Sequence, residues 1–164
     1  KSIAIDKTAD LVISLEVAEH VDEKSAGMFV ESLTRIAPVI LFSAAIPMQG
    51  GVRHVNEQWP EYWEKKFADR GFVAVDYMRR KVWTDKRVSF FYAQNMIVYV
   101  KKEKLAEYPL LEESFRAGND RALPLVHPEM YLHYATKWKS IEPVLWKIPL
   151  PLIKLGKFLL GKRK

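Results

Sequence analysis

Two short apolar runs on either side of one amphipathic segment constrain the fold of this chain more than any other feature. Residues 10–16 form a continuous apolar run of the kind used by buried parallel strands, and residues 39–43 repeat the pattern. Between them, Asp22 can cap a helix that Pro38 stops. Apolar residues recur at helical spacing within that segment: Ala26, Phe29, Val30, Leu33 and Ile36. Strand, helix and strand predict a βαβ unit and therefore an α/β fold.

The next segments predict how the sheet continues. Residues 44–57 are expected to form a loop, and a helix should follow from Trp59 until Gly71 stops it, with Trp59, Trp63 and Phe67 as its apolar stripe. Residues 72–83 and 89–100 have the composition of two strands, turned at residues 84–86. An antiparallel hairpin at the end of a parallel sheet is a common α/β arrangement.

Charge is distributed unevenly along the chain. The whole sequence carries a net charge of +6, yet residues 137–164 alone hold eight basic residues and one acid, Glu142. The other 136 residues therefore hold 18 basic and 19 acidic residues, since the totals are 26 and 20. A nearly neutral body argues against a nucleic-acid interface there. The absence of cysteine excludes disulfides and thiolate chemistry, and it suits a cytoplasmic protein.

The C-terminal third predicts less regular structure. Residues 103–122 are predicted to contain one helix, and the prolines beyond it are expected to break the chain into short pieces. Residues 141–164 combine apolar residues with spaced lysines, in a segment too interrupted to span a membrane. This tail is predicted either to rest on an anionic membrane surface, such as the inner membrane, or to pack on its own domain or another subunit. The expected divisions are 1–101, 102–136 and 137–164.

Polar residues follow both predicted parallel strands, where open α/β sheets bind ligands. His20 is either a general base or acceptor-orienting residue, or a histidine bonded to a nearby carbonyl at a helix start. Glu19 is expected to be a solvated or capping carboxylate. His54 begins a polar loop that either binds an acceptor or caps the next helix. Asn95 is predicted to tie the hairpin to that loop. The spacing of the four histidines predicts no metal site.

Four segments together resemble a known enzyme family. They are DLVISLEVAEHV at 10–21, VILFSAAIP at 39–47, GGVRHVNEQWPEYWEKKFADRGF at 50–72 and FFYAQNMIVYV at 90–100. In combination they resemble bacterial class I S-adenosylmethionine-dependent methyltransferases of polysaccharide and secondary-metabolite gene clusters. The resemblance covers residues 10–101 and implies a Rossmann-like, seven-stranded sheet. Residues 10–16 would then be strand four, residues 39–44 strand five, and the antiparallel hairpin strands six and seven.

The chain departs from that family in one large respect. The glycine-rich loop after strand one and the acidic residue ending strand two have no counterpart, because only nine residues precede the first predicted strand. The sequence therefore resembles the C-terminal half of the domain, with the N-terminal cofactor-binding half missing. By itself it is expected not to transfer methyl groups, and it needs that half or a second copy as partner.

The resemblance also implies roles for individual residues. The implied activity is S-adenosylmethionine-dependent methylation of a small-molecule or glycan acceptor at a hydroxyl. The alternative is a non-catalytic module, derived from a methyltransferase, that binds a partner or a membrane surface. The residues expected beside S-adenosylmethionine are Ser14, Leu15, Glu16 and Val17. Those expected at the acceptor are Asn56, Glu57, Trp59 and Tyr62, with His20 and His54 as catalytic candidates.

Overall fold

The computed structural model describes the backbone of residues 8–145 and the side chains of residues 8–140, and the chain divides into two units after His127. The second unit begins with α6 (Pro128–Leu145), so the prolines at 128 and 143 do not break this segment. Pro128 occupies the start of the helix, where a missing N–H costs nothing, and Pro143 lies close to its end. The boundary expected at 136/137 falls inside α6. Most of the 141–164 tail lies outside the described residues.

A four-stranded mixed sheet forms the centre of the first unit, in the order β1-β2-β4-β3. β1 and β2 are parallel, with Leu11 opposite Val39, and β4 runs antiparallel to both β2 and β3. The α/β fold and the βαβ unit are thereby confirmed. The strand bounds are β1 Leu11–Leu15, β2 Val39–Ser43, β3 Phe72–Val75 and β4 Ile97–Lys101.

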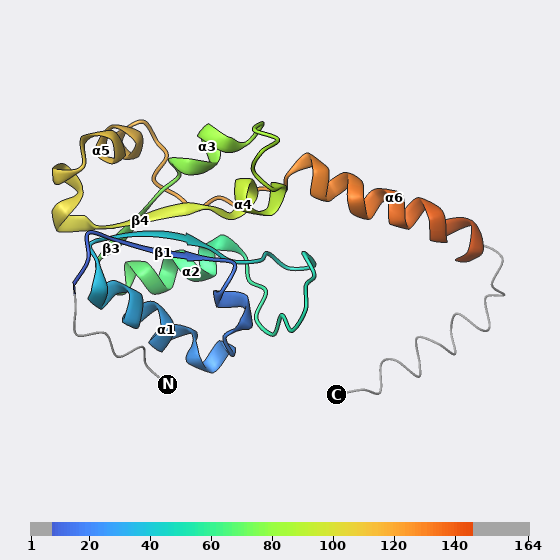
Figure 1. The fold of residues 1–164 in the computed structure, drawn as a ribbon, viewed down its shortest axis with the longest axis horizontal. Coiled ribbons are helices and arrows are strands. Elements are labelled where there is room, and N and C mark those ends of the chain that lie inside the picture. The colour runs from blue at the N-terminus through green and yellow to red at the C-terminus, as the bar shows by residue number, and fades with distance from the viewer. Residues whose placement is uncertain (1–7, 146–164) are drawn as a thin grey trace. The chain divides into compact units, whose positions relative to one another are not determined.

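Helices cover both faces of this sheet (Figure 1). α1 (Glu23–Ile36) and α2 (Pro60–Ala68) lie on one face and bury an aromatic and aliphatic core with Phe42, in which the Phe67 and Tyr99 rings stack 3.9 Å apart. α3 (Met78–Val82) and α5 (Pro109–Arg116) cover the other face over β3 and β4. Two 3₁₀ helices, η1 (Ala18–His20) and η2 (Lys102–Glu107), complete the unit with α4 (Phe90–Asn95).

The helix predictions in the first half are confirmed with small differences. Ala26 and Val30 of α1 are buried, and so are Trp63 and Phe67 of α2. Asp22 stands at the N-cap of α1, but its side chain makes no capping hydrogen bond. Trp59 was expected in the apolar stripe of α2, but it precedes the first turn and is 42% exposed.

The predicted hairpin is correct in its pairing and wrong in its connection. Phe72 lies opposite Lys101, but the strands span only four and five residues. α3 and α4 occupy the sequence between them, where two continuous strands and a tight turn were expected. Arg79 explains the difference: its buried guanidinium binds Asp76 and the backbone carbonyls of Gln94 and Leu123, which a strand could not arrange.

β1 is not the buried strand that its apolar sequence predicts. It lies at the edge of the sheet, where Leu11 is 47% exposed and Ile13 is 60% exposed. Both side chains are on the same face as Val39 and Leu41 of β2, but the core cluster on that face reaches only as far as β2 and includes neither Leu11 nor Ile13. A parallel strand of this composition is usually buried on both faces, so the exposed β1 is a surface suited to a further neighbour.

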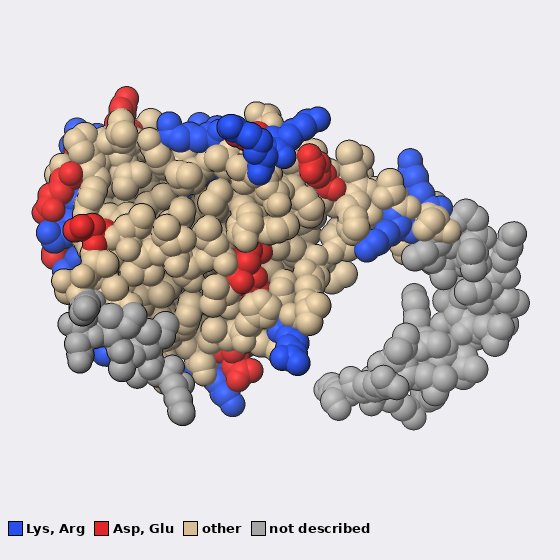
Figure 2. Space-filling view, viewed as in Figure 1, with Lys and Arg blue, Asp and Glu red and all other residues tan. Residues whose placement is uncertain are grey.

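Figure 2 shows one face of the molecule, in which uncharged side chains dominate and acidic residues are scattered. Basic side chains gather over α3, whose exposed basic residues are Arg80 and Lys81. In this view the charge of the first unit is mixed, as the near-neutral balance of residues 1–136 leads one to expect. No helix among residues 8–145 is long and apolar enough to cross a membrane.

Candidate functional site

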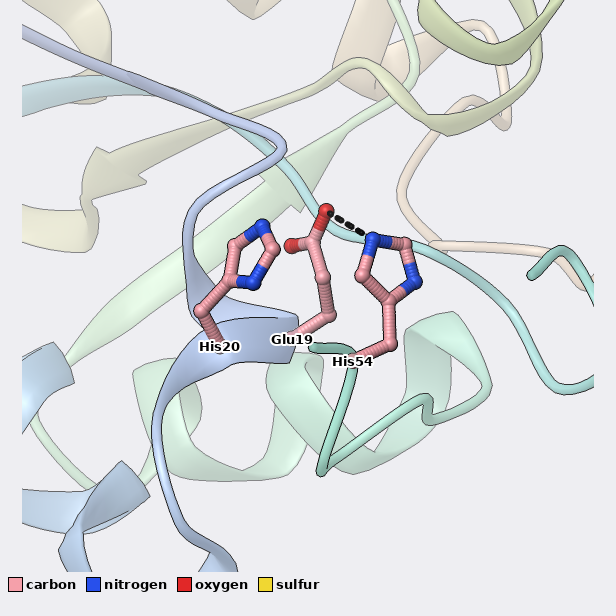
Figure 3. A group of neighbouring side chains, drawn as sticks. All are labelled: Glu19, His20 and His54. Atoms are coloured by element: carbon pink, nitrogen blue, oxygen red, sulfur yellow. Dashed lines mark ion pairs between the residues drawn. The ribbon is translucent and has the colours of Figure 1, made fainter. Parts of the chain in front are cut away.

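The carboxyl ends of the parallel strands β1 and β2 meet at one edge of the sheet and carry the polar segments singled out in the sequence. η1 follows β1, and the loop at residues 44–59 follows β2. The N–H groups of Val55 and Asn56 donate to the carbonyl oxygen of Glu19, at 2.9 and 3.0 Å. These two bonds hold Glu19 and His20 beside His54, so that the three side chains point toward one another (Figure 3).

Glu19 is fully buried, which contradicts the expectation of a solvated or capping carboxylate. Neither of its carboxylate oxygens accepts a hydrogen bond from another described residue, and the nearest basic atom, His54 Nε2, lies 3.9 Å from Oε1. Burial raises the pKa of Glu19, and the nearby Glu16 carboxylate adds to this effect. Its own backbone N–H and the two histidines oppose that rise. A buried carboxylate of this kind is costly to the fold.

His54 is held by the carboxylate of Glu57. Its Nδ1 lies 2.8 Å from Glu57 Oε1, and Glu57 also accepts the N–H groups of Met48 and Gly50, at 2.9 and 2.8 Å. Because a carboxylate can only accept, the proton belongs on Nδ1 of the neutral ring. The lone pair of His54 Nε2 is then free on the side of Glu19.

His20 has a similar arrangement with a backbone partner. Its Nδ1 lies 3.2 Å from the carbonyl oxygen of Arg53, which can only accept, so the proton of the neutral ring again belongs on Nδ1. The carbonyl-bonded alternative for His20 is therefore observed, and it leaves Nε2 free. The imidazoles of His20 and His54 meet edge to face with their centroids 4.9 Å apart.

These three side chains could together hold a metal ion, because one ligand atom from each of Glu19, His20 and His54 lies within 4.8 Å of the others. Sequence spacing missed this group, since His20 and His54 are 34 positions apart and meet only through the parallel pairing of β1 and β2. The available signal was the recurrence of histidine after two successive strands.

The four residues expected beside the cofactor do lie together at the end of β1. Ser14 is buried and its hydroxyl has no partner among the described residues, Leu15 is half-buried, and Val17 is 42% exposed. Glu16 has a left-handed backbone with φ of 51°, an uncommon state for a residue other than glycine. Its N–H donates to the backbone oxygen and hydroxyl of Ser43, which ends the parallel pairing.

Side-chain amides donate hydrogen bonds to both carboxylate oxygens of Glu16. Gln49 Nε2 and Asn95 Nδ2 donate to its two oxygens at 2.7 and 3.1 Å, and Asn95 Nδ2 also reaches Gln49 Oε1 at 2.8 Å. Gln94 supports Asn95 from the same helix, with Nε2 donating to Asn95 Oδ1 at 3.0 Å. Asn95 therefore ties α4 to Glu16 and Gln49, not to the loop at residues 54–59 as predicted. Sequence reasoning did not identify Gln49.

The four residues expected at the acceptor divide into two groups. Asn56 is buried and accepts a hydrogen bond from Gln58, while Glu57 organises the loop around His54. Neither caps α2, whose N-cap position is Trp59 and which has no side-chain cap. Trp59 is exposed, and Tyr62 is half-buried with the Lys66 ammonium 4.3 Å from its ring centroid.

A small pocket of about 280 Å³ opens beside His20, between η1 and the first turns of α1. Its volume lies just below the range of about 300–1,000 Å³ that is typical of small-molecule sites. The lining residues mix polar and apolar side chains: His20, Val21, Asp22, Ser25, Met28, Phe29 and Ser32. His20 therefore adjoins a space that a small polar molecule can enter.

Gly51 sets the position of the His54 ring, and this leads to a prediction. A Cβ at residue 51 would lie 2.2 Å from His54 Nε2, so Gly51→Ala is expected to push the imidazole away from Glu19. The unfolding free energy should fall by about 1 kcal/mol, the low end for added bulk at a packed site, because the obstructing atoms belong to a side chain that can move. The nitrogen and proton NMR chemical shifts of the His54 ring report its displacement, and urea unfolding measures the change in free energy. Gly27→Ala, where the new Cβ meets only an ordinary contact, should leave those shifts unchanged.

The strand ends thus carry two adjoining groups, the amide-bonded Glu16 and the cluster of Glu19, His20 and His54. Gly51 and Glu57 position the second group from the loop after β2. Comparisons with models of protein families, with curated proteins and with solved structures found no match to this chain.

Proposed function

We propose that the chain forms the acceptor-side half of an S-adenosylmethionine-dependent methyltransferase domain, acting on a hydroxyl of a small molecule or glycan. The observation that carries the proposal is the position of Glu16, His20 and His54 at the carboxyl ends of the parallel pair β1–β2. An antiparallel pair, β3–β4, continues the same sheet. This arrangement agrees with the one that the resemblance implies for strands four to seven.

The chemistry required of the chain itself is modest. S-adenosylmethionine supplies a methyl group already activated by a sulfonium, so the protein must align the acceptor oxygen and take up the hydroxyl proton. The pocket beside His20 is the proposed acceptor position. The cluster of Glu19, His20 and His54 is the proposed receiver of the proton, because both neutral imidazoles present an unprotonated Nε2.

Only part of a cofactor site is present in these residues. The buried Ser14 hydroxyl, which has no partner among the described residues, offers one polar contact at the end of β1. No G-x-G-x-G segment occurs anywhere in the 164 residues. We therefore assign the rest of the cofactor site to a further segment that pairs with the open edge of β1, where Leu11 and Ile13 are exposed.

The same open edge favours a second candidate function, a non-catalytic module that adds β1 to the sheet of another chain or of a second copy. The two functions differ in whether S-adenosylmethionine binds once the edge is covered. The test compares the 164-residue chain with the same chain extended by a glycine-rich N-terminal half from a methyltransferase of this class. Calorimetry with S-adenosylmethionine and transfer of radiolabelled methyl groups to sugars are the two measurements.

The extended chain is expected to bind S-adenosylmethionine and methylate a hydroxyl acceptor, and the 164-residue chain is expected to do neither. Micromolar binding by the 164 residues alone would contradict the proposed division of the site. A folded extended chain that binds no S-adenosylmethionine, together with a 164-residue chain that elutes as a dimer in gel filtration, would favour the binding module.

Ile13→Lys gives a direct prediction about the edge. In the 164-residue chain the substitution should change the unfolding free energy by less than about 0.5 kcal/mol, because Ile13 is already 60% exposed. In the extended chain it should cost about 1–3 kcal/mol, since a new neighbour would desolvate the lysine. Val52→Lys is the matched control, because Val52 is 82% exposed in the loop, away from β1. Equal effects of Ile13→Lys in both chains would show that nothing covers this strand.

A further inference from the structure

We infer that Glu19, His20 and His54 bind one divalent transition-metal ion of the Zn²⁺ class. This inference does not depend on methyl transfer, because it follows from the ligand geometry of the 164-residue chain alone. The three side chains come from two segments that the β1–β2 pairing and the backbone bonds to Glu19 hold together. Figure 3 shows the Glu19 carboxylate directed toward the two imidazoles.

The first argument is the buried carboxylate. Glu19 has no exposed surface, and neither oxygen has a hydrogen-bond partner among the described residues. Buried ionisable groups in proteins are generally paired or coordinate metals. The described chain offers Glu19 no lysine or arginine partner, since its one ion pair is the 3.9 Å contact with His54. A cation between Glu19 and the histidines would satisfy this carboxylate.

The second argument is the orientation of the histidines. A metal-binding histidine usually donates its other ring N–H to a carboxylate or backbone carbonyl, which fixes the ring and its tautomer. His54 has this bond with Glu57, at 2.8 Å, and His20 has it with the carbonyl of Arg53, at 3.2 Å. Both rings are thereby left with a lone pair on Nε2, the form that binds a metal.

The third argument is the space between the ligands. Atoms bound tetrahedrally to Zn²⁺ at about 2.1 Å lie about 3.4 Å apart. The ligand atoms here lie within 4.8 Å of one another, and Glu19 Oε1 is 3.9 Å from His54 Nε2. Small side-chain rotations therefore bring them to bonding distance. Gly51, where a Cβ would collide with the His54 ring, leaves the imidazole free to lie there.

The ligand set indicates the class of metal. Two imidazoles and one carboxylate suit Zn²⁺, Fe²⁺, Co²⁺ or Ni²⁺, whereas Mg²⁺ and Ca²⁺ prefer oxygen ligands. Three protein ligands leave at least one coordination position open, as in catalytic sites. His20, one of the three ligands, also lines the small pocket, and a hydroxyl bound at the open position would lose its proton more readily. With an ion bound, Nε2 of both imidazoles would be occupied as a ligand, so the ion would acidify the bound hydroxyl and the released proton would pass to water.

The test titrates the EDTA-treated 164-residue chain with Zn²⁺ by calorimetry and follows Co²⁺ by its visible absorption. We expect one ion per chain and a Co²⁺ spectrum of a site with fewer than six ligands, with excess Mg²⁺ failing to displace Zn²⁺. Glu19→Gln, His20→Gln and His54→Gln should each weaken Zn²⁺ binding by more than the 10- to 100-fold that loss of an outer hydrogen-bond partner costs. Glu57→Gln, which removes such a partner from His54, should fall within that range.

His133→Gln is the matched control, because it removes an exposed histidine of α6 that is not part of the cluster. It should leave both the affinity and the Co²⁺ spectrum unchanged. Circular dichroism and urea unfolding of every variant in EDTA separate a lost ligand from a lost fold. The inference is overturned if the wild type binds no Zn²⁺, or if folded Glu19→Gln binds it as tightly as the wild type. An equal loss in His133→Gln, which would indicate adventitious surface binding, overturns it as well.

Discussion

Replacing Glu19 by glutamine is expected to stabilise the metal-free chain by about 1–3 kcal/mol at neutral pH, the reverse of the usual effect of a buried substitution. The carboxylate is fully buried without a hydrogen-bond partner among the described residues, so folding must desolvate a group that it does not satisfy. Glutamine keeps the shape of the side chain and removes the ionisable group. Urea unfolding of both proteins in EDTA measures the difference.

The control for this prediction is Glu113→Gln, which neutralises an exposed carboxylate on α5 and should change the unfolding free energy by less than about 0.5 kcal/mol. A destabilisation by Glu19→Gln would mean that the carboxylate is satisfied in the folded chain, and the argument from its burial would then fail. If removing the Glu19 carboxylate raises the unfolding free energy, then Glu19 is a residue that the stability of the fold alone does not favour. Such residues are commonly retained for function at the expense of stability.

Of the substitutions proposed, Asp76→Ala is expected to lower the unfolding free energy the most, by about 3–5 kcal/mol. It leaves the buried guanidinium of Arg79 without its charged partner. The Arg79 guanidinium is 1% exposed, and it makes two hydrogen bonds to Asp76, at 2.9 and 2.7 Å. It also donates to the carbonyls of Gln94 and Leu123, at 3.3 and 2.7 Å. Urea unfolding followed by circular dichroism measures the loss.

Asp85→Ala is the matched control for Asp76→Ala, since Asp85 also forms an ion pair with an arginine close in sequence. Arg87 holds the pKa of Asp85 at about 2 through hydrogen bonds, but Asp85 lies at the surface, where water screens the pair. No resolvable change in stability is expected. Similar losses for the two variants would show that burial does not determine the effect.

Asp76→Ala should also disturb the candidate site indirectly. Arg79 connects α3 to the backbone of Gln94, and the neighbouring Asn95 donates to the carboxylate of Glu16. Losing the anchor should therefore loosen the amide network at the end of β1, even though Asp76 touches none of the site residues. The NMR signals of the Asn95 side-chain amide, recorded well below the unfolding transition, would report this change.

Local patterns were enough to predict α1, α2 and the two parallel strands, because each depends on the spacing of its own apolar residues. The antiparallel pairing of the strands that became β3 and β4 could also be predicted from strand composition. The connection between these strands could not, since α3 and α4 depend on the buried Arg79 and on distant carbonyls. The exposure of β1 could not be predicted either, because its sequence is that of an interior strand and only the sheet order places it at the edge.

The sequence by itself determined that histidines and carboxylates follow each parallel strand, and that strand ends are where such a sheet binds ligands. Only the tertiary structure decided that Glu19 is buried beside His54. It also decided that the Glu16 carboxylate accepts hydrogen bonds from side-chain amides of the loop after β2 and of α4. The physical reason is that no local pattern encodes a contact between residues 35 positions apart. That contact exists because β1 and β2 pair in parallel and the loop backbone at residues 55 and 56 donates to the Glu19 carbonyl.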